Sequence, residues 1–268
     1  MIRQPSLGRL AADLFGIWKI LGPAPALRWL VAITQNWRQI AKDRNLQPAD
    51  QAMGPGPFLV RRRGTRTPFR VTGDAAFSGI REMYVRDCYL QRGALSMADG
   101  DVVLDLGANM GNFTNLALAH GNRVRVVAVE PNGLLEERFW ASVSLNEGFR
   151  ERAHFLRAFL GTPGRRQRQM ESTGLYRGSP FLTEDDVLRM TGLSRVNFLK
   201  CDIEGGEFSF FGKNSPLLAI TDQLAMEVHA LGGDVDTFVG RLPVVGLKIR
   251  HVKKDPDGTC TVLARREH

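Results

Sequence analysis

The sequence is poor in cysteine and contains no long apolar run. Its 268 residues include three cysteines, Cys88, Cys201 and Cys260, which lie far apart and form no C-x-x-C pair. An odd, scattered set of this kind indicates neither a disulfide framework nor a zinc cluster. No run approaches the ~20 apolar residues of a membrane span, and charges and prolines interrupt any secretory pattern near the N-terminus. We therefore expect a protein of the reducing cytoplasm.

Negative charge is scarce in the first quarter of the chain. Residues 1–70 carry 12 Lys and Arg but only 3 Asp and Glu, a balance of +9, whereas the remaining residues have a balance of −1. Residues 9–21 and 26–42 place apolar residues at helical spacing, and the Pro- and Gly-rich residues 47–57 are typical of a linker. This pattern divides the chain into a basic helical extension with its linker, residues 1–57, and a main domain, residues 58–268.

The extension has two interpretations. A helical cap packed on the main domain is slightly favoured. The alternative is a hairpin that lies on a membrane surface through residues 9–42, with Trp18, Trp29 and Trp37 at headgroup level and basic side chains facing anionic lipid. Nucleic acid is not expected as a partner, because the Arg61–Arg63 cluster is short and aromatic residues are not interleaved with basic ones.

The main domain has a glycine-rich turn that departs from the dinucleotide fingerprint. An apolar strand ends in Asp105, a tight turn and a helical pattern follow, and a second apolar strand ends in Glu130. Asn109 stands where a pyrophosphate requires the middle glycine. A ligand with an ammonium end and no phosphate fits better, and Glu130 can accept the two hydroxyls of a ribose. S-adenosylmethionine has these properties, and the residues expected to bind it are Asp105, Gly107, Ala108, Asn109, Gly111, Asn112, Glu130, Pro131 and Asn132.

Four sequence blocks, Asp105–Gly111, Val129–Asn132, Leu199–Glu207 and Met226–His229, stand in the order of one known family. Together they resemble the FkbM family of S-adenosylmethionine-dependent methyltransferases over roughly residues 70–265. The one departure is Gly206, where the family often has Ala. The resemblance implies an α/β class I methyltransferase (Rossmann-like) fold, with a seven-stranded, mostly parallel sheet covered by helices on both faces, plus the N-terminal extension. It also implies methyl transfer, usually to a hydroxyl oxygen of a natural product, glycan or glycolipid.

Three polar residues follow the fourth and fifth strands of the expected sheet, where the reactive end of the cofactor should lie. They are Asp202, Glu204 and His229. His229 is the first choice of general base, since the ordinary pKa of histidine is near neutral, and Asp202 can also position cofactor or acceptor. The same three residues could instead hold a divalent cation, but no dedicated metal spacing occurs, so a site without metal is favoured.

Several alternatives stay open at this point. The βαβ pattern also suits an NAD-dependent oxidoreductase, and a methyltransferase fold can serve as a non-catalytic, membrane-associated binding module. The basic residues 161–178 have the pattern of a loop or hairpin and are expected to be solvated rather than to clamp an anionic substrate. Residues 246–252 and 259–264 are expected to form a terminal antiparallel pair. The expected acceptor is a small molecule, glycan or lipid-linked hydroxyl compound, and the expected location is the cytoplasm, with contact at the inner face of the membrane as an option.

Overall fold

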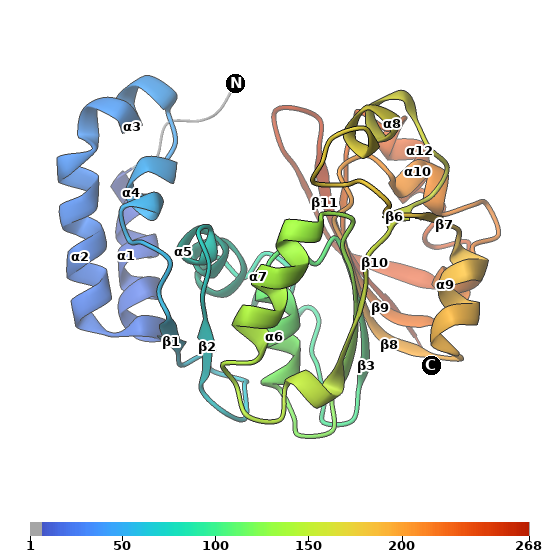
Figure 1. Cartoon of the computed structure of the whole chain (residues 1–268), viewed down its shortest axis with the longest axis horizontal. Helices are drawn as coiled ribbons and strands as arrows, with labels where there is room; N and C mark the ends of the chain where they lie inside the picture. The colour runs from blue at the N-terminus through green and yellow to red at the C-terminus, as the bar shows by residue number, and fades with distance from the viewer. Residues whose placement is uncertain (1–6, 268) are drawn as a thin grey trace.

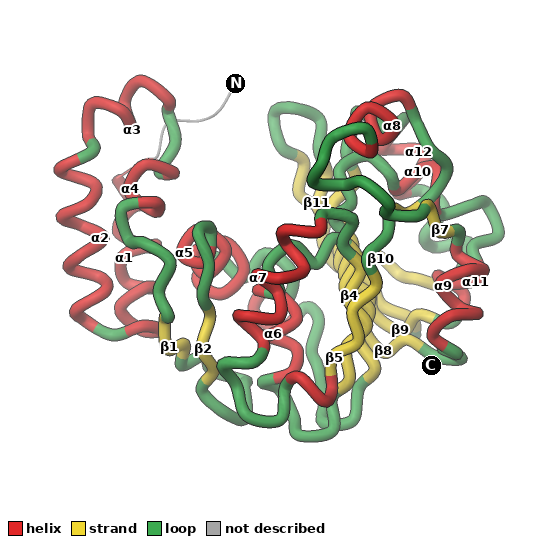
Figure 2. The backbone as a smooth tube through the Cα atoms, viewed as in Figure 1, coloured by secondary structure: helices red, strands yellow, loops and turns green. Residues whose placement is uncertain are grey.

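The computed structural model describes residues 7–267 and is centred on a seven-stranded sheet (Figures 1 and 2). The strand order is β10-β11-β9-β8-β3-β4-β5. Neighbouring strands from β9 to β5 run parallel, whereas β11 is antiparallel to both β9 and β10. The mostly parallel sheet and its terminal antiparallel pair are thus confirmed. The strands are β3 Val102–Leu106, β4 Arg125–Val129, β5 Ala153–Leu156, β8 Val196–Cys201, β9 Thr221–Val228, β10 Leu247–Lys254 and β11 Cys260–Arg266.

Helices cover both faces of the sheet, because the apolar strands send alternate side chains to opposite sides. Val103 and Phe198 point into one core, and Leu104 and Leu199 into the other. The first core is closed by α6 Asn112–Leu118 and α7 Gly133–Val143. The second is closed by α9 Glu184–Thr191, α10 Glu207–Phe210, α11 Pro216–Ala219 and α12 Val235–Val239.

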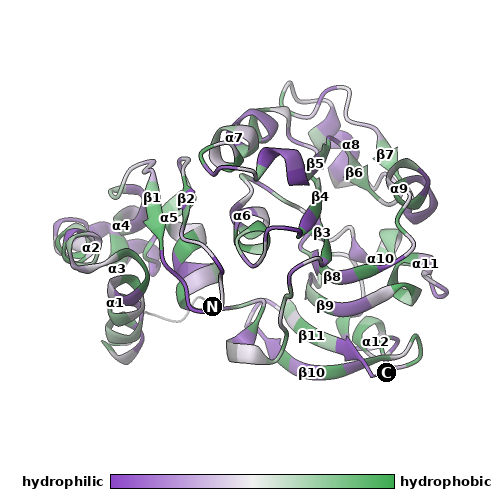
Figure 3. Ribbon diagram, turned by 90° about the horizontal axis from the view of Figure 1, so that it is seen from below, coloured by the Kyte–Doolittle hydropathy of each residue, from purple (hydrophilic) through white to green (hydrophobic). Residues whose placement is uncertain are grey.

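The N-terminal part forms further layers on the α6 side of the sheet (Figure 3). Its buried residues, among them Ile17, Trp29 and Phe77, belong to the same core as α6. Its elements are α1 Leu7–Leu21, α2 Pro23–Gln35, α3 Trp37–Asp43, α4 Gln47–Gln51, β1 Phe58–Val60, β2 Phe69–Val71, α5 Ala76–Gly79, the π-helical turn η1 Ile80–Val85 and the 3₁₀ turn η2 Gln91–Gly93. The extension and the main domain therefore share one hydrophobic core.

Residues 47–57 are not a free linker, and that expectation was wrong. Pro48 stands in the first turn of α4, a position where proline starts a helix rather than breaking it. Ala49 and Met53 are buried in the shared core. The Pro and Gly residues here form turns between packed segments. The boundary after residue 57, between the extension and the main domain, stays a prediction.

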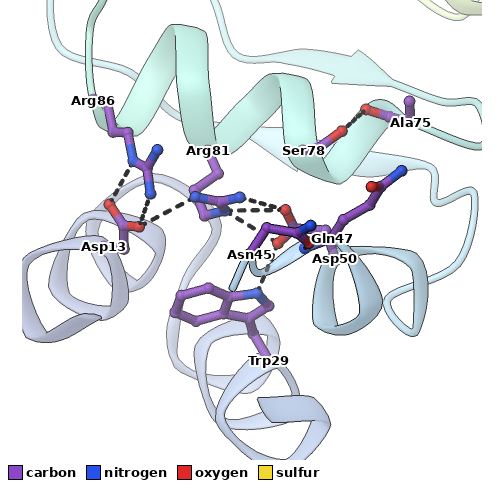
Figure 4. A network of polar contacts seen from close by, with 9 residues as sticks. All are labelled: Asp13, Trp29, Asn45, Gln47, Asp50, Ala75, Ser78, Arg81 and Arg86. Atoms are coloured by element: carbon purple, nitrogen blue, oxygen red, sulfur yellow. Dashed lines mark hydrogen bonds and ion pairs between the residues drawn. The ribbon is translucent and has the colours of Figure 1, made fainter. Parts of the chain in front are cut away.

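A buried ionic network ties the extension to the rest of the molecule (Figure 4). Arg81 of η1 donates to Asp50 of α4 through Nε and a terminal nitrogen, and to Asp13 of α1 at 3.3 Å. Arg86 also binds Asp13, and the Trp29 indole donates to Asp50 at 2.9 Å. Both aspartate side chains are only 3% exposed. Because buried charges must stay paired, this network fixes how α1 and α4 pack on η1.

Trp29 contradicts one part of the membrane interpretation. Its side chain is fully buried and hydrogen-bonded to Asp50, so it cannot lie at headgroup level, whereas Trp18 and Trp37 are exposed. Within residues 7–267, no helix is long and apolar enough to cross a membrane.

The segment after β5 contains more regular structure than a solvated loop. It holds α8 Arg165–Glu171, between the short parallel strands β6 Phe159–Leu160 and β7 Phe181–Leu182, and η3 Arg150–Arg152 precedes β5. The expectation of a loop or hairpin over residues 161–178 was therefore wrong in part, because a helix lies within it. The Gln167 side chain accepts from the Gly164 amide at 3.0 Å at the start of α8, a local helix-start contact that the basic composition obscured.

Candidate active site

A cavity of about 370 Å³ lies at the carboxyl ends of β3, β4 and β8. Its floor is the turn after β3, and Glu130 and Pro131 after β4 form one wall. Asp202–Glu204 after β8 form another wall, while α5, η1 and the segment around α8 close the sides. Ligands of open parallel sheets bind at this edge. The predicted residues that line the cavity are Gly107, Ala108, Asn109, Asn112, Glu130, Pro131, Asp202 and Glu204.

The turn after β3 passes so close to β8 that only glycine fits at its first position. Gly107 has a φ of +76°, and a Cβ there would lie 1.8 Å from the carbonyl oxygen of Asp202. Gly111 has a φ of +78° and packs against the ring of Phe139, so it orients α6 and does not line the cavity. The first glycine thus brings the cofactor turn next to Asp202.

The backbone amides of this turn are already used inside the protein. The amides of Gly107 and Ala108 both donate to the Val129 carbonyl, Asn109 donates to Glu130, and the amides of residues 110 and 111 donate to Asn109 and Ala108. A pyrophosphate needs free amides at this place. The amides of residues 107–111 are therefore not open to a pyrophosphate, which argues against the oxidoreductase alternative.

Glu130 is held rigidly in the cavity wall. Its carboxylate accepts from the amides of Asn109 at 3.2 Å and Asn132 at 3.0 Å, and the residue is 8% exposed. Burial raises the pKa of Glu130, although the two amides act in the opposite direction. Asn132 itself caps α7 by accepting from Leu134, so its side chain serves the helix. A carboxylate has lone pairs beyond these two bonds, which leaves capacity for ribose hydroxyls.

Asp105 lies behind the cavity wall. It is fully buried, accepts from Thr114 at 2.7 Å and pairs with Lys200 at 3.3 Å. Its carboxylate is absent from the cavity lining, whereas Lys200 is part of it. The sequence suggested direct contact with the cofactor, but the structure places the Asp105 side chain outside the cavity lining, next to Lys200.

The lining of the cavity is rich in carboxylates. Among the described residues that line it, Glu82, Glu130, Asp202 and Glu204 are acidic and Lys200 alone is cationic. Burial raises the pKa of Glu82, and the nearby Asp202 acts in the same direction. A negative wall of this kind suits a ligand that carries a sulfonium and an ammonium group. The side-chain oxygen of Asn112 adds a buried acceptor without a hydrogen-bond partner in the cavity lining, so the residues present fit S-adenosylmethionine.

His229 stands behind Asp202 rather than in the cavity lining. Its Nδ1 lies 3.0 Å from the fully buried Glu207, and its Nε2 lies 3.8 Å from Asp202 and 3.9 Å from Glu204. The hydrogen bond with Glu207 raises the pKa of His229 to about 9, with Asp202 and Glu204 adding to the effect. An imidazole that is protonated at neutral pH cannot accept a proton, so this environment argues against His229 as the base.

Tyr89, Glu82 and Glu227 also belong to this end of the site, and the sequence did not single them out. The Tyr89 hydroxyl lies 3.1 Å from Glu227 and 3.4 Å from Asp202. Burial and the neighbouring Asp202 raise the pKa of Glu227 to about 7. The sequence did contain a signal for Glu227, because this residue belongs to the Met226–His229 block and to the strand pattern. Glu82 and Tyr89 come from η1 and the turn beyond it, whose sequence carries no motif.

One set of side chains within residues 7–267 has the spacing of a metal site. Asp202, Glu227 and His229 each place one ligand atom within 4.8 Å of the others. Oxygen and imidazole ligands suit a divalent cation. The sequence suggested Asp202, Glu204 and His229 as possible ligands. In the structure Glu227 takes the place of Glu204, because the Glu204 side chain lies farther out and is 71% exposed. The sequence favours a site that holds no metal, and this stays a prediction.

The fold also has distant likenesses among solved structures. Fibrillarin of Aeropyrum pernix, with natively bound S-adenosyl-L-methionine, is 15% identical over 67% of this chain and 73% of its own, with a TM-score of 0.40. TrmK of M. capricolum, with S-adenosyl-homocysteine, is 7% identical over 66% and 67%, also at 0.40. Precorrin-6y C5,15-methyltransferase of Geobacter metallireducens is 15% identical over 68% and 87%, at 0.41. At these values no conclusion about the acceptor follows.

The family model for the methyltransferase FkbM domain matches residues 105–241. No curated protein matches the sequence. The matched range is just over half of the chain and runs from Asp105, through Glu130 and Asp202, to beyond His229. The chain therefore belongs to the FkbM family of methyltransferases, and its cofactor is S-adenosylmethionine.

Proposed function

We propose that this methyltransferase acts on a hydroxyl oxygen of a glycan, a glycolipid or a natural product. The observation that supports it is the group of carboxylates beside the cofactor turn, where Asp202 lines the cavity. S-adenosylmethionine, when bound, supplies an electrophilic methyl group. A hydroxyl acceptor must lose its proton as its oxygen takes the methyl group, and a carboxylate at the reaction point can receive that proton.

Asp202 is the residue we assign to that role. Its side chain is 28% exposed and faces the cavity, whereas the ring of His229 is 12% exposed behind it. His229, held by Glu207, keeps a positive charge next to Asp202 and acts as a positioning residue. Tyr89 contributes a hydroxyl on the other side of Asp202. Glu204, at the exposed rim, is placed to contact the acceptor.

Methyl transfer to a panel of hydroxyl compounds tests this proposal. With ¹³C-methyl-labelled cofactor, we expect a methyl ether in the product by NMR. His229→Ala should bind S-adenosylmethionine as the wild type does and transfer methyl about 10²-fold more slowly, because Asp202 loses its partner. Label on nitrogen or carbon would overturn O-methylation, and a wild-type rate in His229→Ala would remove that residue from the mechanism.

We also propose that the extension rests on an anionic membrane surface, which would bring the site to lipid-linked acceptors. Lys19, Arg28, Arg38 and Lys42 supply positive charge on the same helices. Aromatic and aliphatic side chains that project into solvent can enter the headgroup region. The exposed apolar residues of α1, α2 and α3 are Leu7, Phe15, Trp18, Leu27, Leu30, Val31 and Trp37.

Flotation with vesicles separates this proposal from the cap interpretation. Deleting the extension would open the shared core, so surface variants are the better probe. The full chain should float with phosphatidylglycerol vesicles at low salt and less at high salt. Trp18→Ala with Trp37→Ala should reduce flotation several-fold, since each indole contributes buried apolar area. No flotation of the wild type, or none lost in the variant, would leave the helices as a cap only.

A further inference from the structure

Lys200 occupies an unusual place for a lysine, because its side chain is 2% exposed in the middle of the sheet. It sits directly across from Asp105 in the parallel pairing of β8 with β3. Its Nζ lies 2.7 Å from the Gly107 carbonyl, 3.2 Å from the Leu106 carbonyl and 3.3 Å from Asp105. An ammonium group has three hydrogens, and three acceptors surround this one.

The two carbonyls that Lys200 binds belong to Leu106, the last residue of β3, and to Gly107, the first residue of the cofactor turn. The amides of the same turn are tied to the other neighbouring strand, since Gly107 and Ala108 donate to Val129 of β4. The turn is thus held by its carbonyls on the β8 side and by its amides on the β4 side. Removing Lys200 would release the Gly107 carbonyl on the β8 side. The Asp202 amide would still donate to the Leu106 carbonyl, and the attachment to β4 would stay in place.

The charge of Lys200 would be a disadvantage if it stood alone. Lys200 lines the cavity, and the ligand of this cavity carries a positive sulfonium and a positive ammonium group. Asp105, fully buried and fixed by Thr114, lies on the other side of the lysine. The aspartate can cancel the field of the lysine at the ligand without touching the ligand itself.

We propose that Lys200 is a positioning residue for cofactor binding: it holds the carbonyls of the turn, and Asp105 neutralises it so that a cationic cofactor is not repelled. This assigns the two buried residues separate tasks. Lys200 sets the geometry of the turn for any ligand of this shape. Asp105 sets the preference for the charged cofactor over its neutral product, S-adenosylhomocysteine.

Four proteins test the proposal by calorimetry with S-adenosylmethionine and S-adenosylhomocysteine: wild type, Lys200→Met, Asp105→Asn and the double variant. Each is also unfolded in urea. Asp105→Asn should weaken the binding of S-adenosylmethionine more than that of the product, because the lysine loses its paired carboxylate and keeps only the influence of Asp202. The double variant has no unpaired buried charge, so it should be more stable than Lys200→Met. It should still bind both ligands about 10- to 100-fold more weakly than the wild type, since the charged hydrogen bonds to the turn are lost.

Wild-type affinity in the double variant would overturn the proposal, because Lys200 would then only balance Asp105. Wild-type affinity in Lys200→Met would overturn it as well. The control is Arg62→Met with Asp87→Asn, which removes another buried ion pair whose residues do not line the cavity. This control should lose stability and keep its affinity for both ligands.

Hydrogen exchange of the wild-type protein tests whether the turn is held in place, even if the double variant does not fold. If the turn is held in advance, the Gly107 and Ala108 amides should exchange slowly without ligand, as slowly as those of β3. Exchange at the rate of an open loop, with slowing only after ligand is added, would contradict a turn that is held in place before the cofactor binds.

Discussion

Replacing Arg81 by Met is expected to lower the free energy of unfolding by about 3–5 kcal/mol. Arg81 is the counter-ion of Asp50 and one of two for Asp13, and both aspartates are almost completely buried. Arg86 still reaches Asp13 in the variant, but Asp50 keeps only the Trp29 indole as a donor among the contacts of this network. An uncompensated buried carboxylate is the main cost, and urea unfolding measures it.

Two companion variants isolate that cause. Adding Asp50→Asn to Arg81→Met removes the unpaired charge and should restore part of the lost stability. Arg123→Met, which removes a surface pair with Asp99 in which the arginine is 77% exposed, should cost less than about 1 kcal/mol. A loss below about 1 kcal/mol in Arg81→Met would show that the extension is not held by this network.

Gly107→Ala is expected to abolish cofactor binding and to destabilise the fold. The new Cβ would meet the Asp202 carbonyl oxygen at 1.8 Å, and backbone cannot move aside as a side chain can. The turn would have to separate from β8, which displaces both Asp202 and the carbonyls that Lys200 binds. Calorimetry with S-adenosylmethionine and a urea titration measure the two effects.

Gly192→Ala is the matched control for backbone conformation. Gly192 ends α9 with a φ of +66°, close to that of Gly107, but nothing lies within 4 Å of its Cβ position. Its substitution should cost about 1–2 kcal/mol from the left-handed conformation alone and leave cofactor affinity unchanged. Equal losses in the two variants would show that close approach to β8 is unimportant.

Sequence patterns predicted the sheet because each strand carries its own local signal. Val102–Leu106 and Val196–Cys201 are mostly apolar, apart from Asp105, Asn197 and Lys200, and they end in a turn, as buried parallel strands do. The residues after those strands then lie at one edge by topology alone. This is why Glu130, Asp202 and Glu204 could be placed near one another before any coordinates.

Such patterns could not predict contacts between segments that lie far apart in the sequence. Glu82 enters the cavity because η1 packs across α6, and no local motif marks it. The positions of the Asp105 and His229 side chains could not be predicted for a related reason. Periodicity shows that a residue ends a strand, but not whether Lys200 or Glu207 has already engaged its side chain. The same limit hid the burial of Trp29, which depends on Asp50 of α4.

The central claim is that the cavity at the turn after β3 is the cofactor site. The most direct test is calorimetry with S-adenosylmethionine on the wild type and on Glu130→Gln. We expect one molecule bound per wild-type chain and an affinity at least about 10-fold lower in Glu130→Gln, since a charged acceptor for two amides and the ribose is lost. Glu137→Gln, on the exposed side of α7, should bind as the wild type does. NADH should not bind, because the amides of the turn are occupied. An unchanged affinity in Glu130→Gln, or binding of NADH in place of S-adenosylmethionine, would contradict the account.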